Sequence, residues 1–132
     1  MKYLLDTNTC IFLMKNLTTV VERYKTCKHF GIAISSITVA ELYFGVYNSS
    51  NPSKNGASLT NFLIGLEVLE FDSAAAMEYG RVRAALRKQG TPIGPLDMLI
   101  AAHAKAKGLT IVTNNVRELR IEFLEIEDWS KE

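Results

Sequence analysis

A short apolar run at the start of the chain is the feature that most constrains its fold. Residues 3–5 are Tyr, Leu and Leu, and the run ends abruptly at Asp6, which is followed by Thr7 and Asn8. An apolar run this short, bounded by polar residues, predicts a buried strand of a parallel sheet. Because ligands bind beyond the carboxyl ends of such strands, Asp6 is a candidate site residue. The alternative is that Asp6, Thr7 or Asn8 only caps a following helix.

Further short apolar runs alternate with segments of helical character. The other predicted strands are residues 32–34, 68–71, 109–112 and 123–126. The predicted helices are residues 18–28, 37–47, 59–66, 74–89 and 96–107. Residues 51–56 have the composition of a loop, and residues 9–15 form an apolar segment without an assigned structure. This alternation predicts an α/β fold, with one parallel sheet of four to five short strands covered by helices on both faces.

Length and composition predict a single domain over residues 1–132. The chain is 48% hydrophobic, which is enough for one core, and it has no tandem repeat or long linker. We see no leader segment and no apolar run near the roughly 18 residues of a membrane span, so we expect a cytoplasmic protein. Cys10 and Cys27 lack the spacing of a zinc site and are expected to be reduced core thiols.

Three carboxylates are expected at the same edge of the predicted sheet. Asp6 follows the first strand, Glu41 lies early in the helix after the second strand, and Asp97 opens a later helix. Oxygen ligands of this kind suit Mg²⁺ or Mn²⁺, and a metal ion would remove the repulsion between the three acids. Simpler explanations exist, because Thr38 and Glu41 have the spacing of a capping box and Asp97 could complement its helix dipole.

The net charge is only +1, but the basic side chains are unevenly distributed. The predicted helix 74–89 carries four cations that are expected to project together, namely Arg81, Arg83, Arg87 and Lys88. By default such a group is a solvated face, yet a phosphate backbone held there would reach the acids, because the next loop presents Asp97. His29 and His103 have no third partner for a hydrolytic triad and are expected to be packed or exposed. The sequence has no Gly-rich phosphate-binding motif.

Four sequence blocks together resemble a known family. They are Leu-Leu-Asp-Thr-Asn at 4–8, Ser-Ser-Ile-Thr-Val-Ala-Glu-Leu at 35–42, Gly-Pro-Leu-Asp at 94–97 and Ile-Val-Thr-Asn-Asn-Val-Arg-Glu at 111–118. In this order they resemble the PIN-domain ribonucleases and, within these, the VapC toxins of VapBC toxin–antitoxin pairs. The resemblance implies a Mg²⁺- or Mn²⁺-dependent endoribonuclease, usually a homodimer, inhibited by a VapB-type antitoxin with which it could assemble on operator DNA.

The resemblance also implies roles for individual residues. Asp6 and Asp97 match the metal-binding aspartates of the family, and Glu41 matches its catalytic glutamate. The fourth acidic position departs from the family pattern, because Asn115 and Glu118 stand where aspartates are often found. Glu118 is the candidate for a fourth catalytic acid. The residues expected to support the ligands or position the substrate are Asn8, Thr113 and Asn115.

The residues around the blocks look closest to the subgroup that cuts initiator tRNA in its anticodon loop. They are Cys-Ile-Phe at 10–12 and Glu-Asp-Trp at 127–129. A near-neutral protein with one basic helix also suits a small folded RNA better than bulk RNA. Two other classes remain as alternatives. One is a haloacid-dehalogenase-type phosphatase with Asp6 as nucleophile, in which Asn8 cannot supply the second acid, and the other is a non-enzymatic protein-binding module.

Overall fold

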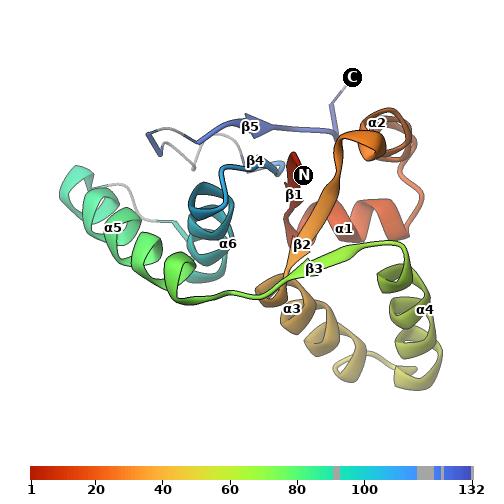
Figure 1. The fold of residues 1–132 in the computed structure, drawn as a ribbon. Helices are drawn as coiled ribbons and strands as arrows, with labels where there is room; N and C mark the ends of the chain where they lie inside the picture. Colours follow the sequence, from red (N-terminus) through yellow and green to blue (C-terminus); the bar gives the residue numbers. More distant parts are fainter. Residues whose placement is uncertain (91–92, 116–120, 123, 132) are drawn as a thin grey trace.

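Five parallel strands form one sheet at the centre of the molecule (Figure 1). The computed structural model describes residues 1–90, 93–115, 121–122 and 124–131. The strands are β1 (Tyr3–Leu5), β2 (Ile32–Ser35), β3 (Glu67–Leu69), β4 (Thr110–Val112) and β5 (Ile126–Glu127). Their order in the sheet is β3-β2-β1-β4-β5. This arrangement confirms the predicted α/β fold with a parallel sheet of short strands.

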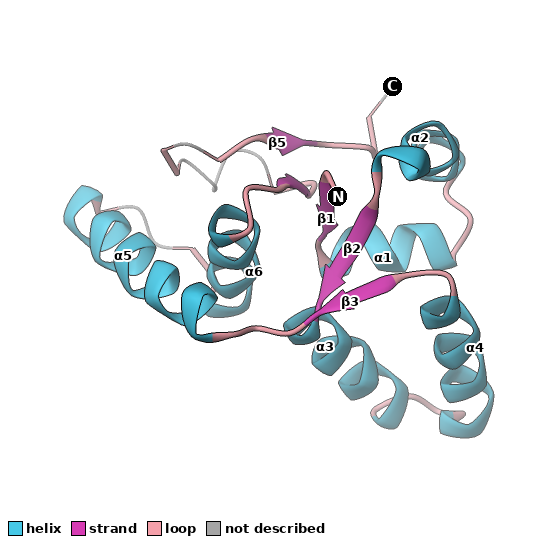
Figure 2. Ribbon diagram, in the orientation of Figure 1, coloured by secondary structure: helices cyan, strands magenta, loops and turns pink. Residues whose placement is uncertain are grey.

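Helices cover both faces of the sheet, as Figure 2 shows. They are α1 (Thr7–Met14), α2 (Thr18–Cys27), α3 (Ser36–Tyr47), α4 (Pro52–Ile64), α5 (Ser73–Gln89) and α6 (Pro95–Ala106), with a 3₁₀ turn, η1, at Lys28–Phe30. The α6 helix packs on one face and is backed by α5, whereas α1 to α4 serve the other face. None of the described helices is long and apolar enough to cross a membrane.

The two faces of β1 build two separate apolar cores. Leu4 belongs to the same core as Val82 of α5 and Ile100 of α6, whereas Leu5 belongs to the core that contains Leu42 of α3 and Val20 of α2. Successive residues of a strand point to opposite faces, so a strand that is covered on both sides must be apolar throughout. This requirement explains why the first run of the sequence is apolar without interruption.

The position of β1 in the sheet decides where its polar end lies. Leu5 pairs with Ile34 of β2 on one side and with Val112 of β4 on the other. The backbone N–H of Asp6 still donates to the Val112 carbonyl at 3.0 Å. Because the strands are parallel, Asp6 and Thr113 leave the sheet at the same edge, which is the edge predicted to hold the site.

Two helical stretches differ from the sequence prediction. The apolar segment without assigned structure belongs to α1, which starts at Thr7 directly after its cap, Asp6. The predicted loop at 51–56 is wrong, because α4 begins at Pro52. Asn51 caps this helix by accepting from the Lys54 N–H at 3.2 Å, and Pro suits the first helical position. The same residue types favour turns and helix starts, so composition alone cannot separate the two.

The remaining differences are small. β3 ends at Leu69, two residues before the predicted end, and β5 begins at Ile126, the last residue of the predicted strand. Phe123, where that strand was predicted to begin, lies outside the described residues. Cys10 and Cys27 are buried and free, which confirms the prediction for both thiols.

Candidate active site

Asp6 lies at the carboxyl end of β1 with only 3% of its surface exposed. Its Oδ1 accepts a hydrogen bond from the backbone N–H of Thr9 at 2.8 Å, which makes Asp6 the N-cap of α1. The Thr9 hydroxyl donates to the Val112 carbonyl at 3.1 Å and so ties α1 to β4. Asp6 therefore does cap a helix, as the alternative explanation requires, and the same carboxylate stands at the sheet edge where a site is expected.

The surroundings of Asp6 disfavour its ionised form. Burial raises the pKa of the Asp6 carboxyl above its usual value, because a charged group is costly to remove from water. Hydrogen bonds from Thr113 and Thr9 lower this pKa, while the negative charge of Asp128 raises it. A cation close to a buried carboxylate stabilises the anion. The environment of Asp6 therefore suits a bound divalent ion.

Glu41 projects from α3 and is held by a residue at the start of α1. The hydroxyl of Thr7 donates to Glu41 Oε1 at 2.6 Å, across 34 positions of the sequence. Because Thr7 directly follows Asp6, this hydrogen bond brings the second carboxylate into the neighbourhood of the first. The structure thus joins two of the three acids that the sequence placed at this edge.

The capping box predicted for Thr38 and Glu41 does not form. The N-cap of α3 is Ser35, whose Oγ accepts from the Ile37 N–H at 3.0 Å, so the helix starts earlier than the box requires. The Thr38 side chain is fully buried, and its hydroxyl has no hydrogen-bond partner among the described residues. Capping therefore does not account for Glu41, and its contact with Thr7 does.

Asp97 lies in the first turn of α6 and is half-buried. Pro95 takes the first helical position, where no N–H is needed, and Gly94 at the N-cap contributes no side chain. A Cβ on Gly94 would lie 3.5 Å from Asp97 Oδ2, so this carboxylate rests against the turn that precedes the helix. The negative charge near a helix N-terminus is favourable, as the simpler explanation of Asp97 states.

These acids offer a metal ion only oxygen donors. Within residues 1–90, 93–115, 121–122 and 124–131, no three His, Cys, Asp or Glu side chains converge closely enough to hold an ion by themselves. Mg²⁺ usually keeps several waters and is bound by one or two carboxylates. A buried Asp6 carboxylate with a second acid nearby fits that mode of binding, and the oxygen-only donor set matches a hard cation.

The other predicted site residues lie beside the carboxylate that ends β1. Asn8 is exposed, and its Nδ2 donates to Asn114 Oδ1 at 3.3 Å. Thr113 is buried and hydrogen-bonds that carboxylate, while its Oγ1 accepts from the Asn115 N–H at 3.1 Å. The structure thus gathers the predicted supporting residues at one edge. Glu118, the fourth predicted acid, lies outside the described part of the chain.

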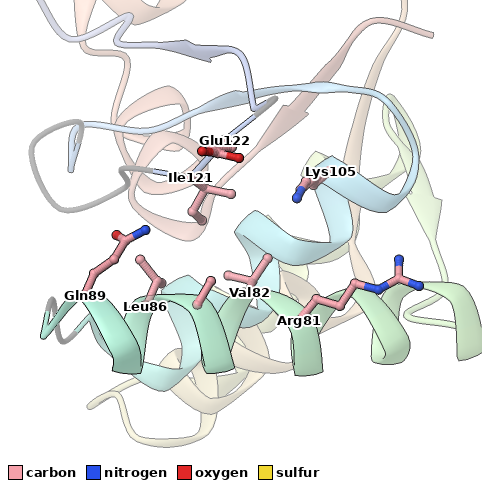
Figure 3. Close-up of a pocket in the computed structure, with 8 residues that line it drawn as sticks. Arg81, Val82, Leu86, Gln89, Lys105, Ile121 and Glu122 are labelled. Atoms are coloured by element: carbon pink, nitrogen blue, oxygen red, sulfur yellow. The ribbon is translucent and has the colours of Figure 1, made fainter.

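The four cations of α5 do not all project together, contrary to the prediction. Arg81 pairs with Glu78 at 3.2 Å, and Lys105 of α6 meets the same carboxylate at 3.0 Å. Both cations line a cavity of about 310 Å³ between α5, α6 and residues 121–122 (Figure 3). The three other cations line a separate, open hollow, and they are Arg83, Arg87 and Lys88. Arg83 and Arg87 are four residues apart and share one side of the helix, whereas Arg81 lies three residues from Glu78 and pairs with it.

Two residues at this edge were not identified as site residues from the sequence. Thr7 is expected only as a cap, whereas in the structure its hydroxyl holds Glu41, a contact between distant positions that carries no local signal. Asp128 directly follows β5, and its Oδ1 accepts from the Ser130 N–H at 2.9 Å. Its charge acts on Asp6. An acid just beyond a strand end is the signal that could have identified Asp128.

The fold and the acidic sheet edge are those of a PIN domain, and the PIN domain family matches residues 3–124. The tRNA(fMet)-specific endonuclease VapC of Salmonella typhimurium is 45% identical over 130 residues, which cover 98% of each chain. VapBC2 from Rickettsia felis, bound to a DNA fragment from its promoter, aligns with a TM-score of 0.93 and 38% identity over 98% of this chain and 99% of that one. DNA-bound VapBC from Salmonella typhimurium gives a TM-score of 0.91 and 46% identity over 98% of each chain. The chain therefore belongs to the VapC ribonucleases of the PIN-domain family.

This membership confirms the resemblance carried by the four sequence blocks. It also argues against the two alternative classes, the phosphatase and the non-enzymatic binding module, because the chain is similar to ribonucleases over nearly its whole length.

Proposed function

We propose that the chain is a single PIN domain over residues 1–132 that uses Mg²⁺ or Mn²⁺ to cut initiator tRNA in its anticodon loop. The observation that carries this proposal is the buried Asp6 carboxylate at the sheet edge, with Glu41 tethered beside it through Thr7. The Salmonella relative, named a tRNA(fMet)-specific endonuclease and 45% identical, supports the choice of substrate.

The acids at the sheet edge have different roles in the proposed reaction. Asp6 and Asp97 would hold the ion, which when bound supplies positive charge that polarises the scissile phosphate and makes water a better nucleophile. Thr7 occupies Glu41 Oε1, which leaves Oε2 to accept a proton from the attacking water. The burial of Asp6 keeps its carboxylate in a low-dielectric environment, where its attraction for a cation is stronger than in water.

The decisive experiment is cleavage of initiator tRNA by the purified protein, freed of any antitoxin. We expect cleavage only with added Mg²⁺ or Mn²⁺ and none with EDTA, because carboxylates alone cannot neutralise the charge of the transition state. An unstructured RNA of the same length is the matched control and should be cut more slowly. Cleavage that resists EDTA would reject the metal requirement, and equal rates on both RNAs would reject the folded substrate.

The fourth acidic position is a separate part of the proposal. Asn115 can bind an ion through a neutral oxygen but cannot take a proton. The carboxylate of Glu118 can bind an ion and can also take a proton. We therefore expect Glu118→Gln to slow cleavage more than Asn115→Ala, with partial recovery at raised Mn²⁺. Wild-type metal dependence in Glu118→Gln would instead leave Asp6, Glu41 and Asp97 as the only carboxylates required.

The basic residues of α5 would hold the phosphates of the tRNA stem. The strongest candidates are the three that line one hollow, since several cations close together can neutralise more phosphates than an isolated one. They are Arg83, Arg87 and Lys88. Arg81 would contribute less, because Glu78 already neutralises it.

The proposed partner is a VapB-type antitoxin, and the proposed toxin is a cytoplasmic homodimer that joins this antitoxin on operator DNA. The solved structures from Rickettsia felis and Salmonella typhimurium are VapBC complexes bound to DNA, which supports this assembly. A basic side chain of the antitoxin would neutralise the acids at the sheet edge. Light scattering of the purified chain, alone and with the antitoxin from the neighbouring gene, tests both associations. A monomer that forms no complex would reject them.

A further inference from the structure

The histidine of α6, His103, is fully buried and bonded to the helix that carries Glu41. Its Nδ1 lies 2.8 Å from Ser35 Oγ, and neither side chain is exposed to solvent. The two residues are 68 positions apart in sequence. A fully buried polar pair of this kind is costly unless the hydrogen bond forms, so the bond defines how the two elements sit together.

Ser35 connects this bond to the start of α3. It is the last residue of β2, and its Oγ also accepts from the Ile37 N–H at 3.0 Å as the N-cap of α3. One oxygen atom therefore meets His103 on one side and the first turn of α3 on the other. A movement of the His103 ring relative to Ser35 would therefore also displace the first turn of α3.

The His103 ring also contacts an aromatic side chain. The ring of Phe71 packs edge-on against the His103 ring at 5.3 Å and an angle of 77°. The Phe71 N–H donates to the hydroxyl of Ser36, the first residue of α3, at 3.0 Å. The segment after β3 thus fixes His103 and α3 together, and the junction contains three chain segments rather than a single pair.

The environment of the ring favours its neutral form. Burial lowers the pKa of His103 and the charge of Lys107 lowers it further, whereas Asp72 and the Glu70 carbonyl act in the opposite direction. Nε2 has no hydrogen-bond partner among the described residues. The bond to Ser35 is therefore the well-formed directional contact of this ring among the described residues.

We propose that His103 is a positioning residue of the ribonuclease site. It stands on the same helix as Asp97, and through Ser35 it fixes the origin of the helix that carries Glu41. The His103–Ser35 bond therefore sets the distance between two of the acids without either residue touching the substrate. This inference rests on the proposed function, since it assigns Glu41 and Asp97 to one reaction.

An apolar side chain of similar volume would fill the buried space of His103 beside the Phe71 ring. Packing alone therefore does not require a histidine here, whereas a defined orientation between α3 and α6 requires a directional bond. Residues that orient catalytic groups from behind change the rate of the reaction more than the binding of substrate, because they act on the geometry of the transition state.

The test compares His103→Leu, His103→Asn and His103→Gln in cleavage of initiator tRNA. Asn places a donor and an acceptor near the position of Nδ1 and can restore the bond whichever atom carries the proton, whereas Gln extends toward the position of Nε2. We expect His103→Leu and His103→Gln to lower kcat by about 10- to 100-fold with KM within about twofold of wild type. His103→Asn should recover most of kcat.

Two controls separate positioning from stability and from failure of the proposed function. Leu109→Ala opens a cavity in the same core at the opposite end of the sheet, so it should lower the melting temperature while keeping kcat within about twofold. Wild type and Asp6→Asn in the same assay show whether the proposed reaction occurs at all. If wild type cleaves but His103→Asn and His103→Gln are equally active, or if kcat only follows melting temperature across all variants, the positioning role is overturned. The Asn and Gln pair decides the question even if His103→Leu does not fold.

Discussion

The sheet edge around Asp6 and the outer surface of α5 are built in opposite ways. At the edge, Asp6 is buried and Glu41 partly buried, and hydrogen bonds from Thr9 and Thr7 hold the two carboxylates. On α5, Arg83 and Arg87 are exposed and belong to a helix that packs through its apolar face. Chemistry that depends on distances thus belongs to the hydrogen-bonded sheet edge, and contacts that tolerate variation belong to the exposed surface.

The same difference predicts how the two regions respond to mutation. Loss of a partner in a buried polar network leaves another group unsatisfied and costs more than the loss of an exposed charge. Changes at the sheet edge should therefore affect the rate of cleavage, and changes on α5 should affect binding and its dependence on salt. The largest effects are expected at the buried acids and the smallest at an exposed ion pair.

Asp6→Asn should produce the largest effect. We expect the cleavage rate to fall by roughly three orders of magnitude or more, because a proposed metal ligand loses its charge. The melting temperature at neutral pH should be equal or higher, because burial penalises the ionised Asp6 carboxyl and Asn still caps α1. Cleavage assays and thermal unfolding measure the two quantities. A lower melting temperature together with lost activity would make Asp6 a structural residue instead.

Thr7→Val tests whether the hydrogen bond across α1 and α3 matters for the reaction. The substitution keeps the shape of the side chain but removes the hydroxyl that holds Glu41. We expect kcat to fall by about 10- to 100-fold, as is typical when a residue that orients a site group is removed. Thr7→Ser, which retains the hydroxyl, is the matched control and should keep most of the rate. Equal rates for Val and Ser would show that Glu41 does not depend on this bond.

The cations of α5 should affect binding rather than the cut itself. Alanine at Arg83, Arg87 or Lys88 should weaken tRNA binding and reduce the slope of log affinity against log salt by about one for each phosphate that the protein no longer binds. Arg81→Ala is the control on the same helix and should change the slope less, because Glu78 pairs with Arg81. Binding is measured in the Asp6→Asn background at several salt concentrations. An equal reduction for all four variants would remove the distinction between the two sides of α5.

The smallest predicted effect concerns Asp72, the N-cap of α5, which forms an ion pair with Lys107. Its hydrogen bond with Lys107 lowers the pKa of the Asp72 carboxyl below its ordinary value of 3.8. A depressed pKa in the folded state stabilises the protein above the unfolded value, and this contribution is lost as the pH falls through the folded value. Asp72→Asn should therefore lower the melting temperature slightly at pH 7, and the difference should vanish in acid. A difference that persists in acid would point to the cap instead.

The sequence predicted the parts of the site that depend on local pattern. The short apolar run before Asp6 predicted a buried strand, and Gly94 and Pro95 before Asp97 predicted the start of a helix. Asp6 therefore appears where a strand meets a helix, and Asp97 appears in the first turn of a helix. The predicted metal site rests on this placement, although its occupant and its fourth acid remain predictions.

The parts that the sequence did not predict depend on contacts between distant segments. Both Ser35 and Thr38 can cap a helix, and the choice is made by the sheet, because Ser35 still pairs with Leu69 of β3. The bond from Thr7 to Glu41 likewise requires α1 and α3 to be packed before it can exist. The pair of Glu78 and Arg81 is different, since its spacing of three on one helix was visible in the sequence.

The length of β1 has a consequence for insertions and deletions. The strand spans Tyr3–Leu5, is paired on both sides, and delivers Asp6 by register alone. Removal of one residue from this strand would turn the following side chains to the opposite face of the sheet and point the carboxylate away from α3. Residues 48–51, which connect two helices outside the sheet, carry no such constraint. The chain can therefore change in length there without moving the acids, whereas β1 can change only by substitution.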